Sequence, residues 1–216
     1  MLDALLESAM VYRMPSIMAS KNGHRHTTAL RPQRGGDLSD AGRIPIPMMR
    51  RMIGGWNVAC CSSPILSETQ SEWVEYVNRK FDTSNAEVLA PKEHIKISVA
   101  DGSWRSYHLP RRIRRIDTVR WFALGKGKDM RKLLKTVPAI GGETNIGFGR
   151  VGQWIVEHIE DDWTWFAPSP DGQVLMRPLP DCSELPQQLI GARKSFGACV
   201  SPYWHHSRFC EVVQPC

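Results

Sequence analysis

The chain has 216 residues, of which 42% are hydrophobic, and its 28 Lys or Arg against 22 Asp or Glu give a formal net charge of +6. This length can bury a substantial core and suits one large domain or two small ones. No apolar run approaches the roughly 20 residues that span a bilayer, so no membrane association is expected. The first ten residues carry Asp3 and Glu7 instead of the basic start of a secretory signal, which predicts a cytoplasmic protein.

The first quarter of the chain predicts a helix, a long polar segment and two extended segments. Leucines at roughly helical spacing predict a helix over residues 2–14, limited by Pro15. Residues 21–43 are polar and lack periodicity, which predicts a long loop or a mobile arm. A short extended segment over residues 43–49 and a core strand over residues 56–65 are expected next.

Residues 68–81 predict a second helix, because large apolar residues recur at every fourth position: Trp73, Val77 and Phe81. The dipeptide Asp101-Gly102 lies between two β-prone runs, at residues 95–99 and 103–109. Such a dipeptide is a strong signal of a two-residue hairpin turn.

The third quarter predicts a strand over residues 118–124 and a basic helix over residues 128–137, closed by Pro138. A glycine-rich segment, residues 141–152, follows the helix and is called the glycine loop below. Another strand is expected over residues 151–159.

The last quarter predicts strands at residues 163–166 and 174–177 around a Pro-Ser-Pro-Asp-Gly turn. The tail after Pro186 shows no clear periodicity and is expected to be irregular. The order of helices and strands favours an α+β protein.

The glycine loop has the sequence G-G-E-T-N-I-G-F-G-R-V-G, with five glycines in twelve positions. Glycine lacks a Cβ and accepts positive φ, so such a loop lets the backbone approach a partner closely. From Arg105 to Lys135 the chain carries eleven Lys or Arg and two Asp. A close-approach loop beside this charge suggests a phosphate backbone as partner. The glycines could instead serve only to turn the chain. The loop matches neither a Walker loop nor a dinucleotide fingerprint.

We expect the loop's backbone N–H groups to face phosphate oxygens, with an arginine adding a charged contact and short polar side chains contacting sugar or base edges. The glycines in this prediction are Gly141, Gly142, Gly147 and Gly149, and the side chains are Thr144, Asn145 and Arg150.

Two further basic groups precede the loop. The run R-R-I-R-R would be anchored by Ile113 and Ile116 while its arginines face RNA phosphates or bases. A solvated basic surface is the alternative. Trp121, in a basic strand, is the best candidate for stacking on a base. The basic residues in this prediction are Arg111, Arg112, Arg114, Arg115, Lys126, Lys128, Arg131 and Lys132.

The polar arm at residues 20–44 is also basic and could order on nucleic acid, although a loop without a partner is equally compatible with it. Its candidate RNA-binding residues are Lys21, His24, Arg25, His26, Arg31 and Arg34.

The six cysteines include no CxxC pair, which favours reduced, mostly buried thiols. The C-terminal group Cys199, His205, His206, Cys210 and Cys216 does not match the usual spacing of zinc ligands. We therefore expect neither a metal nor a cofactor.

Several stretches together, in their order along nearly the whole chain, carry a family resemblance. A basic helix is followed by a G-x-x-x-x-G-x-G-R loop. The other stretches are M-L-D-A-L-L at residues 1–6, I-P-I-P at 44–47, G-G-W-N-V-A-C-C at 54–61, L-M-R-P-L-P at 175–180 and S-P-Y-W-H at 201–205. The chain resembles the repeat-associated (RAMP) RNA-binding proteins of CRISPR systems, and within them the Cas-five-type, "Csf three" branch of type IV effector complexes.

The resemblance implies a ferredoxin-like, RRM-related core over residues 1–160, with an inserted hairpin or arm, and a C-terminal extension over residues 161–216. It implies a non-catalytic subunit that caps a ribonucleoprotein filament by holding the 5′ handle of the CRISPR RNA (crRNA), in support of crRNA-guided DNA targeting. The implied partners are the Cas-seven-type backbone subunit, the large subunit and target DNA near the protospacer-adjacent motif. A ferredoxin-like core normally opens with a strand, whereas this chain opens with a helix.

Two alternatives stay open. The chain could be a metal-independent repeat-RNA endoribonuclease in which His94 or His108 acts as general base on a ribose 2′-hydroxyl. It could also be a protein–protein adaptor whose basic face is incidental.

Overall fold

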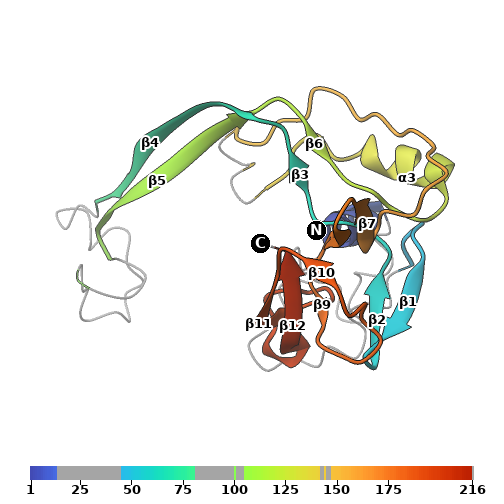
Figure 1. Ribbon diagram of the computed structural model, residues 1–216. Helices are drawn as coiled ribbons and strands as arrows, with labels where there is room; N and C mark the ends of the chain where they lie inside the picture. Colours follow the sequence, from blue (N-terminus) through green and yellow to red (C-terminus); the bar gives the residue numbers. More distant parts are fainter. Residues whose placement is uncertain (14–44, 81–99, 101–104, 142–143, 145–146, 216) are drawn as a thin grey trace, which may run out of the picture. The chain divides into compact units, whose positions relative to one another are not determined.

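The structure is a computed structural model that describes residues 1–13, 45–80, 100, 105–141, 144 and 147–215 (Figure 1). It is a mixed α+β protein, in which the described residues form mostly strands with two α-helices. The chain divides into two compact units. The first comprises Met1–Ile65 and Arg120–Cys216, and the second comprises Leu66–Val119. The sequence instead predicts a core over residues 1–160 and a C-terminal extension over residues 161–216, and this division stays a prediction.

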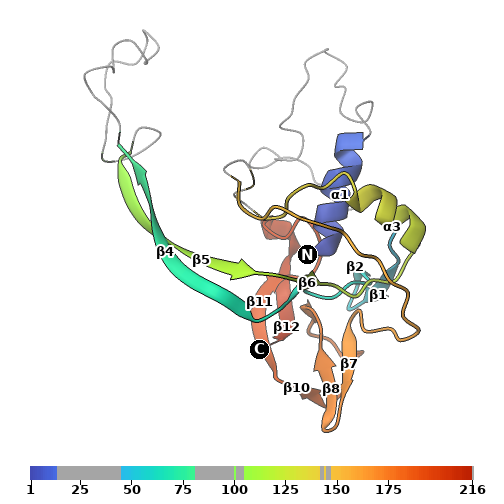
Figure 2. The ribbon, with the colours of Figure 1, turned by 90° about the horizontal axis from the view of Figure 1, so that it is seen from above.

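The two helices of the first unit confirm the predicted helices at residues 2–14 and 128–137. Helix α1 (Leu2–Arg13) and helix α3 (Gly127–Leu134) contact one another, as Figure 2 shows. Leu6 of α1 and Leu133 of α3 are almost fully buried in the first core cluster of this unit, together with Ala59. No helix in the described part of the chain is long and apolar enough to cross a membrane.

A hairpin packs on these helices. Strands β1 (Arg50–Ile53) and β2 (Trp56–Ala59) pair antiparallel around Gly54-Gly55, both with positive φ. Two-residue turns of this kind need glycine because L side chains rarely adopt such φ values. The predicted strand at residues 56–65 is therefore confirmed over its first part.

The residues after 120 join this hairpin through isolated bridges, Met48 to Gly125 and Cys61 to Ala123. The predicted strand at residues 118–124 consequently exists only as the short β6 (Val119–Arg120), which pairs with β3 (Ile65–Leu66), and as the second of these bridges.

The second unit contains a long two-stranded ribbon, and the predicted helix over residues 68–81 is wrong. Strand β4 (Thr69–Arg79) pairs antiparallel with β5 (Tyr107–Ile116). Trp73 lies opposite Ile113, and Val77 lies opposite Leu109, so the apolar residues that suggested a helix face pair across strands instead. The predicted hairpin around Asp101-Gly102 lies mostly outside the described residues.

The C-terminal part forms two three-stranded sheets, so the expectation of an irregular tail is wrong. The first sheet has the order β10-β8-β7 and the second has the order β11-β12-β9. Their strands are β7 (Phe166–Ser169), β8 (Gly172–Leu175), β9 (Leu179–Pro180), β10 (Leu189–Ile190), β11 (Ala192–Ala198) and β12 (Phe209–Pro215), with the 3₁₀ helix η5 (His206–Arg208) before β12. The predicted strand at residues 163–166 starts three residues later, as β7, and the one at residues 174–177 starts two residues earlier, as β8. The turn between them is confirmed.

These sheets enclose a second core cluster, in which Leu175, Leu179 and Val212 are almost fully buried beside Val58 of β2. The hairpin β1–β2 therefore contributes one face to each cluster. Residues 151–159 form no strand, contrary to prediction.

A buried arginine links the two clusters. Arg177 is fully buried, and its guanidinium donates to the backbone oxygens of Ala59 and Cys199 at 2.6 and 2.8 Å and to Tyr203 Oη at 2.9 Å. The Tyr203 hydroxyl in turn donates to Asp3 Oδ2 of α1 at 2.6 Å. The N-terminal helix is thus attached to residues near the end of the chain through buried polar groups.

Candidate nucleic-acid interface

Helix α3 has one apolar and one basic face. Met130, Leu133 and Leu134 are buried, whereas the basic side chains are exposed. The Arg131 guanidinium donates to the backbone oxygen of Val156 at 2.6 Å, which attaches the segment after the loop to the helix. Among the described residues, the remaining lysines make no ion pair: Lys126, Lys128, Lys132 and Lys135. Positive charge is therefore available along the outer side of α3.

The glycine loop is closed at its base. The N–H of Ile140 donates to the oxygen of Gly149, and that of Val151 donates to the oxygen of Pro138, both at 2.9 Å. At Gly149, with φ +64°, a Cβ would lie 1.8 Å from the Ile140 oxygen. Only glycine permits this closure, because any side chain would collide with backbone.

The outer part of the loop is exposed and unobstructed. Gly141 and Gly147 have φ values of +104° and +98°, and a Cβ at either would meet nothing within 4 Å. Thr144 and Arg150 are also exposed. These glycines serve the backbone conformation and leave space next to the chain, which suits a partner from outside. Gly142 and Asn145 lie outside the described residues.

Trp121 lies against protein. Its ring is 6.2 Å from that of Trp154, and both pack on the first core cluster. Trp154 donates from Nε1 to the Val137 oxygen at 2.8 Å, whereas the buried Trp121 Nε1 has no partner among the described groups. The pair supports the segment that joins α3 to the loop.

The arginine run lies on β5, in the second unit. Alternation along the strand places Arg112 and Arg114 on one face of the ribbon and Arg111 and Arg115 on the other. Glu72 on β4 binds two of them, with its oxygens 3.0 Å from Arg112 Nε and 2.9 Å from Arg114 Nε. All of these groups are substantially exposed, so the ion pairs are accessible to a competing phosphate.

The basic arm lies outside the described residues, so Lys21, His24, Arg25, His26, Arg31 and Arg34 stay predictions. His94 also lies outside them. His108 is exposed on β5, stacks on Tyr76 with ring centroids 4.5 Å apart and contacts Asn78 through Nδ1.

The described C-terminal cysteines and histidines are dispersed among protein partners. The Sγ atoms of Cys199 and Cys210 are 4.0 Å apart, and His205 Nδ1 lies 2.9 Å from Ser207 Oγ. Burial, reinforced by Cys210, raises the pKa of the Cys199 thiol to about 12. In the described part of the chain, no three His, Cys, Asp or Glu side chains form a group that could hold a metal ion.

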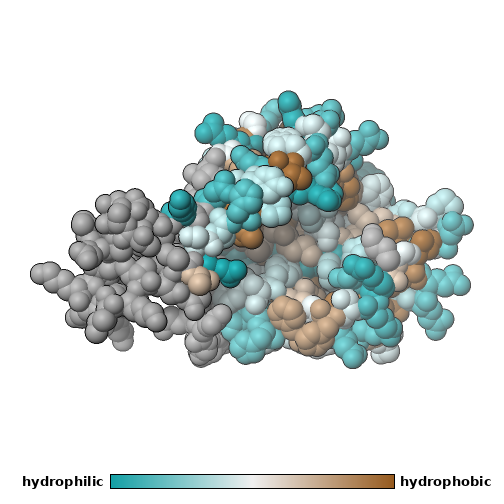
Figure 3. Space-filling view, turned by 90° about the vertical axis from the view of Figure 1, so that its left-hand side faces the viewer, coloured by the Kyte–Doolittle hydropathy of each residue, from teal (hydrophilic) through white to brown (hydrophobic). Residues whose placement is uncertain are grey.

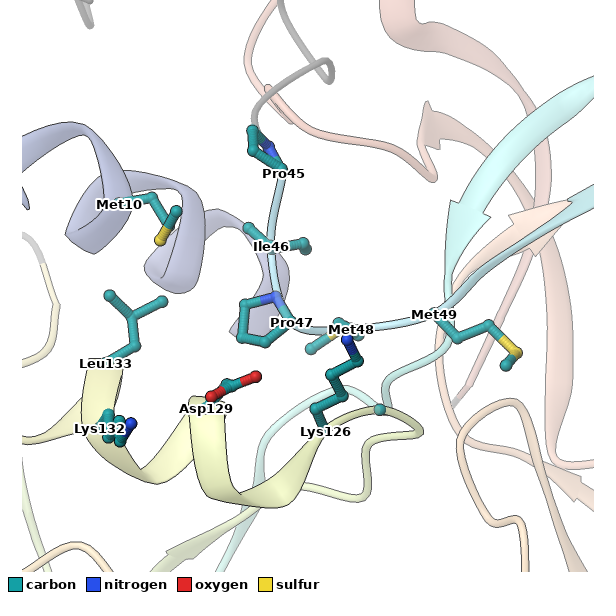
Figure 4. Close-up of a pocket in the computed structure, with 11 residues that line it drawn as sticks. Met10, Pro45, Ile46, Pro47, Met48, Met49, Lys126, Asp129, Lys132 and Leu133 are labelled. Carbon is teal, nitrogen blue, oxygen red and sulfur yellow. The ribbon is translucent and has the colours of Figure 1, made fainter. Parts of the chain in front are cut away.

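The sequence analysis missed a pocket of about 580 Å³ between α1, α3 and residues 45–49 (Figure 4). Met10, Met48, Met49 and Leu133 give it apolar walls. The I-P-I-P stretch was the available signal, because two prolines fix an extended segment that cannot pair fully with a strand. Figure 3 shows hydrophilic side chains over much of one face of the molecule, with apolar ones in scattered patches.

In the comparison with protein families, the chain matches a family of CRISPR-associated proteins. The chain belongs to the family described as CRISPR type IV associated protein Csf3, whose family model matches residues 62–215. The match includes the β4–β5 ribbon, α3 and the glycine loop, and it confirms the resemblance found in the sequence. A search of curated proteins found no match.

Proposed function

We propose that this chain is a non-catalytic RNA-binding subunit that caps a type IV CRISPR ribonucleoprotein complex by holding the 5′ handle of the crRNA. In this role it supports crRNA-guided DNA targeting. The observation that carries the proposal is the closed, exposed glycine loop that follows α3, where two lysines in the helix and two beside it lack ion pairs among the described residues.

The chemistry of this surface suits a phosphate backbone. Lysines bind phosphates as point charges without demanding a particular base, and backbone N–H groups that face outward can donate to phosphate oxygens. The Gly147 N–H already donates to the Thr144 oxygen at 3.2 Å, so this group would have to exchange its partner. Arg150, exposed at the base of the loop, adds a charged donor. Such contacts hold a strand in register, while sequence selection requires contacts to base edges.

A ferredoxin-like, RRM-related core is part of the proposal. It is supported by α1 and α3 packing together against the β1–β2 hairpin, with Ala59 in their shared core. A C-terminal extension over residues 161–216, packed on a core over residues 1–160, remains part of the same proposal.

The β4–β5 ribbon is proposed to lie along the RNA. Arginines on both of its faces would contact phosphates, and exposed Trp73, Tyr76 and Leu109 offer apolar surface to bases. The Cas-seven-type backbone subunit and the large subunit are the proposed protein partners, with target DNA near the protospacer-adjacent motif as a further contact.

The proposal is tested by the salt dependence of binding to labelled single-stranded repeat RNA. Each phosphate contact on a single strand contributes about −0.7 to the slope of log K against log salt. The variant Lys128→Ala/Lys132→Ala should lower the slope's magnitude by about 1.4 if both lysines contact phosphates. The control Lys194→Ala removes an exposed lysine paired with Asp181 and should leave the slope unchanged. A flat salt response of the wild type contradicts the proposal.

The non-catalytic role has its own test. The purified chain is incubated with repeat RNA in EDTA, and the RNA is expected to stay intact. Specific cleavage that His108→Ala abolishes would replace the proposal by the endoribonuclease alternative.

A further inference from the structure

The pocket between α1 and α3 has preformed walls. The N–H of Lys126 donates to the Pro47 oxygen at 3.0 Å, and the N–H of Met49 donates to the Leu124 oxygen at 2.8 Å. Gly125 lies so close to this segment that a Cβ would be 2.3 Å from the Pro47 oxygen. Residues 45–49 are therefore fixed against the start of α3, and the pocket does not depend on a ligand for its shape.

The interior and the rim differ in chemistry. The interior is apolar and rich in methionine, a flexible and polarisable side chain that adapts to flat or irregular ligands. At the rim, Lys126, Asp129 and Lys132 project from α3, with Asp129 directed towards Pro47 between the two lysines (Figure 4). Among the described residues, these three side chains make no ion pair with one another or with other groups.

We propose that this pocket takes one unpaired nucleobase of the bound RNA, and that the base carries an exocyclic amine. The inference rests on the proposed function. The apolar walls would pack on the base, the two lysines would bind the adjacent phosphates, and the Asp129 carboxylate, which only accepts hydrogen bonds, would accept from the amine. The volume lies within the usual range for small-ligand pockets, about 300–1,000 Å³.

The charge pattern favours a nucleotide over an apolar peptide side chain. A flat apolar ligand flanked by negative charge on both sides matches an apolar pocket flanked by two lysines. An amino group on the ligand supplies a donor to the single carboxylate between the lysines, whereas a hydrocarbon ligand supplies none.

The test uses the full-length chain and a short labelled RNA in which an abasic site is placed at each position in turn. One position should weaken binding to the wild type by about five-fold or more, the lower end of the range for one packed base. Met10→Trp, which enters the pocket from α1 (Figure 4), should bind intact RNA as weakly as the wild type binds the abasic RNA. The abasic site should weaken binding by this variant no further. Met52→Trp is the matched control, because Met52 is exposed on β1 and does not line the pocket. It should behave as the wild type.

Asp129→Ala, which removes the acceptor oxygens, tests the role of the carboxylate. At the sensitive position, the wild type should prefer guanine to inosine and cytosine to uracil, and the variant should lose this preference.

Three results overturn the proposal while leaving the proposed function intact. The first is RNA binding by the wild type with the expected salt slope but without any sensitive position. The second is full sensitivity of Met10→Trp to the abasic site. The third is normal RNA binding by Met10→Trp together with failure to co-purify with the other subunits, which would assign the pocket to a partner's side chain. Failure of the wild type to bind RNA at all would overturn both proposals.

Discussion

Arg177 shows how one side chain can hold several segments together. Burial lowers the pKa of its guanidinium, but Tyr203, Cys61 and Asp3 raise the pKa by more, so the group stays charged. Its hydrogen bonds reach backbone oxygens in two segments and one hydroxyl, and that hydroxyl bonds to the carboxylate of Asp3. The sequence placed Arg177 in a family stretch but gave no sign that it is buried, because arginine is usually exposed.

Arg177→Met should destabilise the protein strongly, because it leaves the buried Asp3 carboxylate without its compensating charge. Breaking a buried pair by removing one partner costs about 3–5 kcal/mol. Urea denaturation followed by tryptophan fluorescence measures the change. Lys194→Ala, which removes one partner of an exposed ion pair, is the control and should change the midpoint little. Equal urea midpoints for the two variants would contradict a stabilising role of the buried Arg177 side chain.

The buried thiols predict a loss of stability at alkaline pH. Burial raises the pKa of Cys199 to about 12 and that of Cys61 to about 11, from a reference value of 9.0. At pH values between the reference pKa of 9.0 and the raised pKa of each thiol, the folded chain keeps protons that the unfolded chain releases. The free energy of unfolding therefore falls as the pH rises.

Urea midpoints at about pH 8 and about pH 10 should therefore differ, and Cys199→Ala should narrow the difference. The comparison uses the pH dependence of each protein, since the substitution itself lowers stability at both pH values. An unchanged difference in the variant would show that Cys199 does not contribute.

At the scale of elements, local patterns identified the helices and misidentified the long strand. Helices α1 and α3 have apolar residues at helical spacing and a proline that limits each of them, so local sequence suffices. In β4, residues Trp73 and Val77 satisfy the period of a helix and also the alternation of a strand. Pairing with β5, some 40 residues further on, decides between the two.

The prediction of a strand over residues 151–159 is wrong for a related reason. The β-prone composition is present, but the Trp154 indole donates to the Val137 oxygen in the segment after α3, and the Val156 oxygen accepts from Arg131 of α3. The segment is held by the helix instead of by a neighbouring strand. No local pattern in the sequence reveals such side-chain contacts.

The ion pairs of the β4–β5 ribbon lead to a prediction about Glu72. This residue neutralises part of the charge of Arg112 and Arg114. If the ribbon binds RNA, Glu72→Gln should tighten binding and steepen the salt slope by about 0.7, equivalent to one more phosphate contact. Binding titrations at two salt concentrations measure the effect. Glu68→Gln, which removes an exposed carboxylate before β4, is the matched control. Weaker binding by Glu72→Gln would exclude the arginines as phosphate ligands.

At the scale of the whole molecule, the two units suggest that the ribbon can be removed. The ends of the second unit lie close together, since the Ser67 N–H donates to the Thr118 oxygen at 2.9 Å. The sequence predicted neither the two units nor the C-terminal sheets, because both depend on pairing between distant segments. The candidate site could be proposed from the sequence, since charge and glycine content are local properties, and its residues stay predictions.

Replacing residues 69–116 by a short Gly-Ser linker should leave the first unit folded, with one cooperative unfolding transition, because both core clusters belong to it. RNA affinity should fall and the salt slope should become shallower, since the arginines of β5 are lost. Circular dichroism and binding titrations measure the two effects. An unfolded product would show that the units are not independent, and unchanged affinity would remove the ribbon from the RNA interface.

The bonds from α1 to the end of the chain also constrain biosynthesis. Asp3 pairs with Tyr203, and Glu7 accepts from the Ser201 hydroxyl, across 200 and 194 positions of sequence. A nascent chain must therefore expose residues 201–203 outside the ribosome before α1 can make these contacts. Until then Leu2 and Leu6 lack part of their final surroundings, so a chaperone or an early partner would find its target at α1.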